Sequence, residues 1–134
     1  MRWFVIKVAI IGSRTISGID ISKHVPSNVD AIISGGAIGV DALSEEYADK
    51  NNIRKIIIKP DYNKYKKSAP IIRNKKIVDL ADLVIAFWDG KSRGTKFTVD
   101  YARLKGKKVV LHKIINIWGI LNGFFTVKNF GLLC

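Results

Sequence analysis

The stretch Leu83-Val84-Ile85-Ala86-Phe87-Trp88, followed at once by Asp89-Gly90-Lys91-Ser92-Arg93-Gly94-Thr95, decides the fold class. Residues 83–88 form an apolar run without polar alternation, which is typical of a strand covered on both faces. Residues 89–95 are rich in glycine and small polar side chains, which indicates a loop after that strand. We therefore predict a central strand in a sheet with helices on both sides.

Similar apolar runs, each followed by a turn signal or a polar segment, occur along the rest of the chain. They predict further strands at residues 4–11, 31–33, 54–59 and 108–112. Helix signals separate these runs. Val40, Leu43 and Tyr47 recur at helical spacing.

Pro70 opens a second helix that should run to residue 80, after a polar connection over residues 60–69, and residues 96–104 carry a third. Strands separated by helices imply right-handed crossovers and a parallel sheet. The predicted fold is α/β: a Rossmann-like, doubly wound, mainly parallel five-stranded sheet with helices on both faces.

Length and composition favour one folded domain. The chain has 134 residues, of which 48% are hydrophobic and 25% charged, and a domain of this size buries roughly two-thirds of its unfolded surface. We place a nucleotide-ligand-binding domain at residues 1–112 and a C-terminal extension, not a separate domain, at 113–134.

The extension departs from the strand–helix pattern. Residues 114–127 are uncharged but too short to span a bilayer as a helix, and Asn122-Gly123 between apolar flanks predicts a hairpin. No membrane partner is expected. The aromatic residues here need a burial site, either over the sheet edge or in a homodimer or higher oligomer. They are Trp118, Phe124, Phe125 and Phe130.

The net charge is strongly positive, at +12 with a pI near 10.0, and it would attract phosphates of any kind. Residues 50–76 carry much of the excess, with Asp61 as their only acid, and residues 103–113 have no acid at all. These clusters fit either solvated helix ends and loops or a surface for nucleic acid.

Cys134 is the only cysteine, so the chain forms no internal disulfide, and a reducing, cytoplasmic setting fits best. The apolar start carries Lys7 and no cleavage signal, which favours a first strand over a signal peptide. His24 and His112 lack metal-ligand spacing and are interpreted as surface or packing residues. We predict no metal and no cofactor.

In an open parallel sheet, ligands bind beyond the carboxyl ends of the strands. Three loops should meet there: Gly12-Ser13-Arg14, residues 34–41 and residues 90–95. Glycines let backbone N–H groups approach a phosphate, and a following helix start adds partial positive charge. The candidate phosphate-binding residues are Gly12, Ser13, Arg14, Ser34, Gly35, Gly36, Gly39, Ser92, Arg93, Gly94 and Thr95.

Neither G-x-G-x-x-G nor G-x-x-x-x-G-K-[ST] occurs, so the loops do not indicate NAD binding or ATP hydrolysis. Asp41 is either a helix-capping residue or an acceptor for a ribose hydroxyl or base. Asp89 is interpreted as shaping the Asp-Gly turn, and Asp100 as a solvated helix residue or, as a weak candidate, a catalytic acid. No convincing acid–base pair emerges.

The chain resembles the SLOG superfamily, which groups the Smf/DprA proteins with the LOG-type phosphoribohydrolases, and within it the YspA-like family. The resemblance covers residues 7–111. It rests on Ile11-Gly12-Ser13-Arg14, Ser34-Gly35-Gly36-Ala37-Ile38-Gly39-Val40-Asp41, Pro70-Ile71-Ile72-Arg73-Asn74 and residues 81–95.

This resemblance implies a Rossmann-like fold with a pocket for nucleotides or nucleotide-derived signals, into which Arg73 and Asn74 should point. The phosphoribohydrolases carry PGGxGTxxE, whose glutamate works in glycosidic cleavage. Gly94 and Thr95 match that motif, but Thr98 stands at the position of the glutamate. The departure favours a binding or sensing role over hydrolysis.

Three functions follow. The leading one is binding of a nucleotide or nucleotide-derived phosphate ligand. The second is hydrolysis of the N-glycosidic bond of nucleoside monophosphates, and the third is binding of single-stranded nucleic acid through residues 50–76, with Trp88 or Tyr62 as possible stacking platforms.

Overall fold

The computed structural model describes residues 4–116 and 127–133. It is a three-layer α/β structure around a six-stranded sheet of order β3-β2-β1-β4-β5-β6. Strands β1 to β5 pair in parallel, as predicted. The strands are β1 (Ile6–Gly12), β2 (Val29–Ser34), β3 (Arg54–Ile57), β4 (Leu83–Trp88), β5 (Lys108–Asn116) and β6 (Val127–Leu133).

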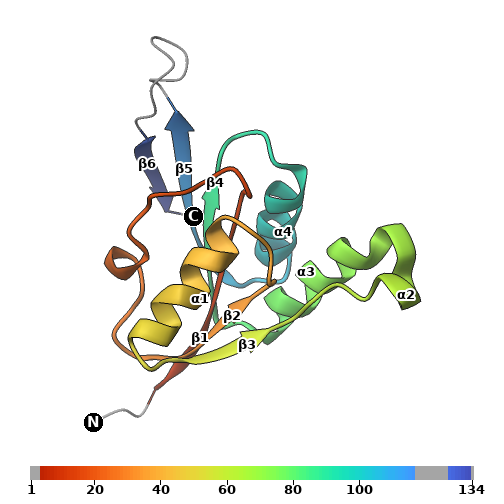
Figure 1. Cartoon of the computed structure of the whole chain (residues 1–134), viewed down its shortest axis with the longest axis horizontal. Helices are drawn as coiled ribbons and strands as arrows, with labels where there is room; N and C mark the ends of the chain where they lie inside the picture. The colour runs from red at the N-terminus through yellow and green to blue at the C-terminus, as the bar shows by residue number, and fades with distance from the viewer. Residues whose placement is uncertain (1–3, 117–126, 134) are drawn as a thin grey trace.

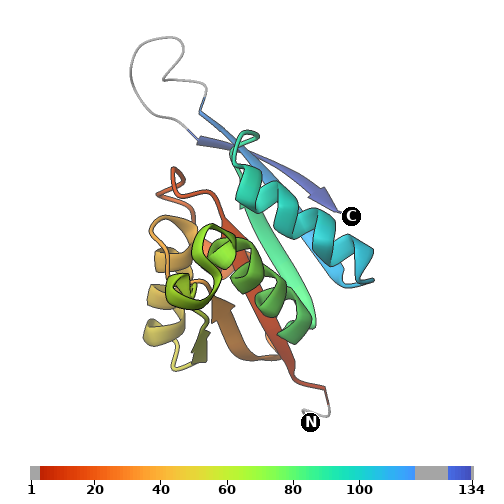
Figure 2. The same cartoon turned by 90° about the vertical axis from the view of Figure 1, so that its right-hand side faces the viewer.

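Helices cover both faces of the sheet (Figures 1 and 2). One face packs on α1 (Val40–Lys50) and the short 3-10 helix η1 (Ile21–Lys23), in a core with Ile10, Ile32 and Phe87. The other face packs on α3 (Ala69–Leu80) and α4 (Arg93–Leu104), in a core with Ala9, Val84 and Val109. Because β4 is buried on both faces, its sequence shows no polar alternation.

The chain differs from the predicted elements in several places. Helix α4 begins at Arg93 and not at residue 96, because the Ser92 side chain caps it by accepting the Thr95 N–H. The connection over 60–69 contains α2 (Tyr62–Tyr65) and η2 (Lys66–Ser68). Strand β3 ends at Ile57 and not at residue 59.

The C-terminal extension contributes a strand to the sheet. Strand β5 continues past residue 112 to Asn116, and β6 pairs with it antiparallel from Asn116↔Val127 to Val110↔Leu133. The pairing places β6 at the edge of the sheet, and the edge hairpin or oligomer contact expected of the extension stays a prediction. The Asn122-Gly123 turn and the side chains of the tail aromatics lie outside the described residues.

The strand order reverses between β1 and β4. From β1 the chain proceeds through β2 to β3 on one side, then returns through α3 to β4 and continues to β5 on the other. The carboxyl ends of β1 and β4 lie in register, with Gly12 paired to Phe87. Ligands of doubly wound sheets bind at such a reversal.

Candidate functional site

A cavity of about 540 Å³ opens at this reversal. Its walls come from the loop after β1, the loop between β2 and α1, the start of α3, and the turn that leads from β4 into α4. The predicted site residues that line it are Gly12, Arg14, Gly35, Asp41, Arg73, Asn74, Ser92, Gly94 and Thr95. Ser13, Ser34, Gly36, Gly39 and Arg93 do not line it.

The buried Ser13 joins the loops after β1 and β4. Its N–H donates to the Phe87 carbonyl at 3.0 Å, and its Oγ accepts the Asp89 N–H at 3.1 Å. Thr15 adds a hydrogen bond from Oγ1 to Asp89 Oδ2 at 2.9 Å. Ser13 therefore links the two loops that line the cavity without lining it itself.

Two of the predicted phosphate-binding glycines are needed for close packing. A Cβ on Gly12 would lie 2.5 Å from the Phe87 carbonyl oxygen. Gly39 has φ of +78°, and its Cβ would lie 2.7 Å from the Arg14 backbone. Glycine is required at both positions because the backbone of a distant segment approaches closely.

Gly94 is in a different setting. It lies in the first turn of α4 and lines the cavity, and a Cβ built there meets nothing within 4 Å. Thr95 also lines the cavity, with its hydroxyl 3.1 Å from that of Ser92. The start of α4 therefore lines the cavity, with open space beside Gly94, while the Thr95 N–H is accepted by the Ser92 hydroxyl.

The turn before α4 is ordered by Asp89. Its Oδ1 accepts the N–H groups of Lys91 and Ser92, each at 2.8 Å. Partial burial raises the pKa of Asp89, but these hydrogen bonds and those from Thr15 and Ser13 lower it, and the net pKa lies below its ordinary value. Asp89 is thus held as a carboxylate, in agreement with its predicted role in shaping the turn.

Two buried charged residues, Arg73 and Asp41, line the cavity from α3 and from the start of α1. Arg73 donates from Nη1 to the Gly35 carbonyl at 2.6 Å and from Nε to Asn74 Oδ1 at 2.7 Å. Asp41 accepts the Ala37 N–H at 3.1 Å. Both charged side chains are 8% exposed. A Cβ on Gly35 would lie 2.8 Å from Arg73 Nη1 and 2.9 Å from Asp41 Oδ2, so a side chain at position 35 would displace both charged groups.

Burial shifts the pKa values of both Asp41 and Arg73. Burial raises the pKa of Asp41, while the Ala37 N–H and the charge of Arg73 oppose the shift. Burial lowers the pKa of Arg73 and the charge of Asp41 opposes that change, but a guanidinium remains protonated at neutral pH. Each charge thus offsets part of the cost of burying the other.

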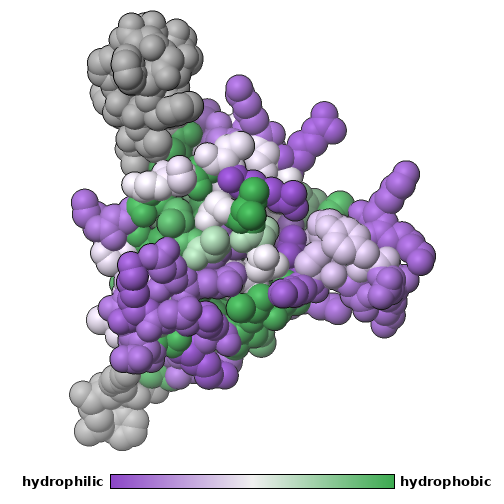
Figure 3. Space-filling model, viewed as in Figure 1, coloured by the Kyte–Doolittle hydropathy of each residue, from purple (hydrophilic) through white to green (hydrophobic). Residues whose placement is uncertain are grey.

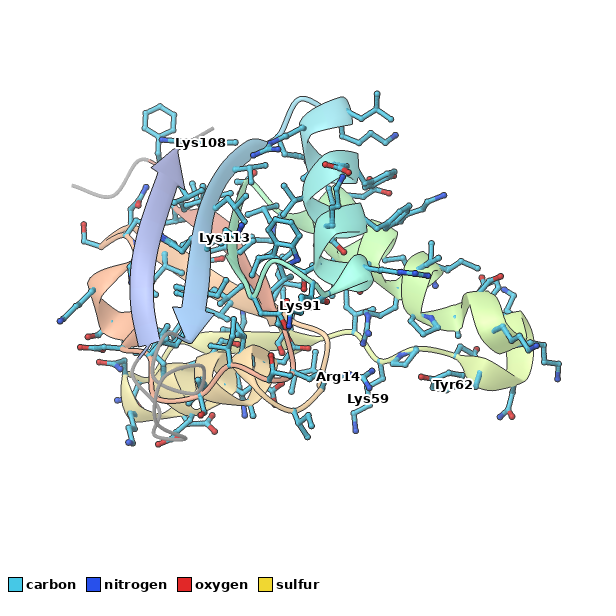
Figure 4. All side chains as sticks on the ribbon, turned by 90° about the horizontal axis from the view of Figure 1, so that it is seen from above. Arg14, Lys59, Tyr62, Lys91, Lys108 and Lys113 are labelled. Atoms are coloured by element: carbon cyan, nitrogen blue, oxygen red, sulfur yellow. The ribbon has the colours of Figure 1, made fainter. Side chains whose placement is uncertain are left out.

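Two exposed cations, Arg14 and Lys91, lie at the cavity. Arg14 and Lys91 line it from two loops, and in the view from above they lie in the same region as Lys59 (Figure 4). Hydrophilic side chains also cover α1 and the arm around α2, on either side of a paler and more apolar central region (Figure 3). Such cations attract anions.

Neither Thr98, at the position of the missing glutamate, nor Asp100 supplies a carboxylate to the cavity. Thr98 is buried, and its hydroxyl donates to the Gly94 carbonyl at 2.8 Å. Asp100 forms an ion pair with Lys96 at 2.7 Å and lies on a small separate pocket beside Trp88, not on the main cavity. The structure therefore does not bring the weak catalytic candidate to the ligand site.

Several lining residues were not singled out as ligand contacts from the sequence: Ile11, Thr15, Ala37, Pro70, Ile77, Asp89, Lys91 and Thr98. Lys91 lies within the glycine-rich loop 90–95, so its position in the sequence could have identified it as a ligand contact. Ile77 could not be identified in this way, because an apolar residue at helical spacing indicates core packing.

The basic cluster 50–76 extends over β3, α2, η2 and α3. Here lysines lie over aromatic rings: Lys76 Nζ is 5.4 Å from the Tyr65 ring centroid, and Lys75 Nζ is 5.7 Å from that of Tyr101 and 6.0 Å from that of Phe97. Side chains of α2, α3 and α4 thus combine cations with aromatic groups.

The two histidines, distant in sequence, are neighbours in the fold. The rings of His24 and His112 have centroids 4.3 Å apart, and Phe87 stacks on His112 at 5.2 Å. Among the described residues, no three His, Cys, Asp or Glu side chains gather as a metal site requires. None of the helices in the described part of the chain has the length and apolar character that crossing a bilayer requires.

Comparison with known proteins gives a likeness in structure. No protein-family model matches the chain, and no curated protein matches it in sequence. DNA processing protein A (DprA) from Streptococcus pneumoniae superimposes with a TM-score of 0.66 at 21% identity. The match covers 89% of this chain and 53% of the DprA chain, so the chain spans about half the length of that protein. The finer YspA-like resemblance stays a prediction, and the chain has the Rossmann-like α/β fold of DprA.

Proposed function

We propose that the protein binds a nucleotide or a nucleotide-derived phosphate ligand in the cavity at the β1–β4 reversal. The observation that carries the proposal is the open start of α4, where Gly94 and Thr95 face the cavity beside Lys91 and Arg14. A helix start favours anions because its first N–H groups have no partner within the helix and the helix dipole is positive there.

The size and charge of the cavity support the same ligand class. Its volume of about 540 Å³ lies within the range of about 300–1,000 Å³ typical of small-molecule sites. Arg14 and Lys91 would contact phosphate oxygens, and an arginine can bind two of them at once. The cavity also occupies the place in the sheet where doubly wound folds bind nucleotides.

The test is a thermal-shift screen of the whole chain against nucleoside mono-, di- and triphosphates, ADP-ribose and cyclic dinucleotides. A ligand at one hundred times its Kd should stabilise by about 2.7 kcal/mol, which is a shift of several degrees for a domain of this size. A flat screen would contradict the proposal and direct attention to nucleic acid.

A variant locates the binding site. Gly94→Leu places a side chain in open space without a positive φ, so the protein should fold while phosphate binding is lost. The matched control is Lys96→Leu, also on α4 but outside the cavity lining. Retained affinity in the folded Gly94→Leu protein, or equal loss in the control, would place the ligand elsewhere.

Single-stranded nucleic acid is a second candidate, favoured by the lysines that lie over Tyr65, Phe97 and Tyr101. Phosphates would pair with the lysines and bases would stack on the rings. DprA, to which the chain is similar in fold, is named a DNA processing protein. Binding of a labelled oligonucleotide should weaken steeply with salt and should be lost in Lys75→Glu/Lys76→Glu. A shallow salt slope would argue against this candidate.

A further inference from the structure

Asp41 gives the cavity an acceptor at the start of α1. The side chain lines the cavity and is 8% exposed. Its Oδ2 accepts the Ala37 N–H at 3.1 Å. A carboxylate offers about four acceptor positions, and the backbone of the 35–37 loop uses only part of them. Asp41 therefore retains capacity to accept hydrogen bonds from a ligand.

Donors lie beside this acceptor. Arg73 carries five N–H donors, of which the bonds to the Gly35 carbonyl and Asn74 Oδ1 use two. Because Asn74 Oδ1 is the atom that accepts from Arg73, the amide nitrogen of Asn74 remains a donor for the cavity. An acceptor next to two donors is complementary to a pair of hydroxyl groups, which both donate and accept.

Asp89, the other carboxylate that lines the cavity within the described residues, is differently placed. Its Oδ1 accepts two backbone N–H groups and its Oδ2 accepts the Thr15 hydroxyl. It is committed to the turn before α4. Among the described carboxylates of the cavity, Asp41 is therefore the better placed to meet a ligand.

The residues that line the cavity at Asp41 are better suited to contact a sugar than a base. Among the described residues that line the cavity, none has an aromatic side chain on which a base could stack, and the apolar ones include Ile77, Pro70 and Ala37. Asp41 also follows β2, and in dinucleotide-binding sheets of the same strand order an acidic residue in the corresponding βαβ unit hydrogen-bonds a ribose hydroxyl. Both observations point to hydroxyl recognition.

We infer that Asp41, with Arg73 and Asn74 beside it, binds the vicinal hydroxyls of a ribosyl phosphate, so that the site selects ribose over 2-deoxyribose. This inference rests on the proposed function, because it assumes that the phosphate of the same ligand lies at the start of α4. It narrows the ligand from any phosphate-bearing nucleotide to one with an intact 2′,3′-diol.

The first experiment uses the wild-type chain alone. Calorimetric titration with the 5′-monophosphates of adenosine, guanosine, cytidine and uridine, each against its 2′-deoxy analogue, measures the selectivity directly. We expect the deoxy analogue to bind about ten- to one hundredfold more weakly, because it leaves polar groups of the site unpaired. Equal affinities overturn the inference and leave the proposed function standing. Absence of binding to every monophosphate overturns the inference, whereas the proposed function is decided by the thermal-shift screen with the wider set of ligands.

A variant assigns the selectivity to its residue. Asp41→Asn keeps the shape but removes the charged acceptor, so the ratio of ribo to deoxy affinity should fall toward one, while Asp100→Asn outside the cavity should keep the wild-type ratio. A folded Asp41→Asn protein, judged by cooperative melting, that keeps the wild-type ratio overturns the assignment. If the variant does not fold, the wild-type comparison still decides the selectivity.

Discussion

Thr15 and Asp89 lie 74 positions apart in sequence and are joined by a hydrogen bond of 2.9 Å from Thr15 Oγ1 to Asp89 Oδ2. The contact connects the loop after β1 to the turn after β4. Because the same carboxylate accepts the N–H groups of Lys91 and Ser92, it fixes the start of α4 relative to Arg14. The geometry of the cavity therefore depends on one side chain that need not touch the ligand.

Replacing Asp89 should destabilise the protein. Asp89→Ala removes charge-assisted hydrogen bonds and should lower the free energy of unfolding by about 1.5–3 kcal/mol at pH 7, as measured by urea denaturation. Because the folded pKa lies below the ordinary 3.8, this stabilisation is present above pH 3.8 and is lost as the pH falls through the folded pKa. A difference between wild type and variant that persists in full at lower pH would contradict this role.

Two glycines should respond oppositely to alanine. Gly39→Ala places a Cβ 2.7 Å from the Arg14 backbone at φ of +78°, so it should cost more than about 1 kcal/mol of stability. Gly94→Ala meets open space in the first turn of α4 and should be neutral or stabilising by a few tenths to about 1 kcal/mol. Thermal melting of both ligand-free proteins distinguishes these outcomes, and similar melting temperatures would contradict the packing role assigned to Gly39.

The partly buried His24 should make the stability of the protein depend on pH near neutrality. Burial lowers the pKa of His24 from 6.5, with Asp20 opposing and Lys23 reinforcing the shift. The folded state thus prefers the neutral ring, so the stabilisation is full above pH 6.5 and falls as the pH drops below that value. His24→Phe should flatten the melting temperature between pH 7.5 and 5.5, and an unchanged slope would assign the sensitivity to other groups.

Trp88 should report ligand binding. Its indole Nε1 donates to the Ser92 carbonyl at 2.9 Å, and Ser92 caps the helix whose start faces the cavity. In a chain with Trp3 and Trp118 replaced by phenylalanine, a bound phosphate should change the Trp88 emission. The signal should disappear in Gly94→Leu. Emission that follows ligand in that variant would mean that Trp88 senses a different site.

The sequence by itself determined the class of fold and the loops that form the site. The unbroken apolar run 83–88 predicted a strand buried on both faces, and the helical signals between strands predicted parallel crossovers. These features are local, since strand period, helix period and turn chemistry are properties of neighbouring residues. For the same reason, the loops after β1, β2 and β4 could be named as the candidate site.

Only the tertiary structure decided what each residue in those loops does. Gly39 and Gly94 are equivalent in a sequence pattern, yet Gly39 contacts the Arg14 backbone while Gly94 faces open space. Likewise, only the tertiary structure shows that Arg73 reaches the Gly35 carbonyl across 38 positions. It also shows that β5 pairs with β6. The role of a loop residue is set by the distant segment that packs against it, and no local pattern encodes that neighbour.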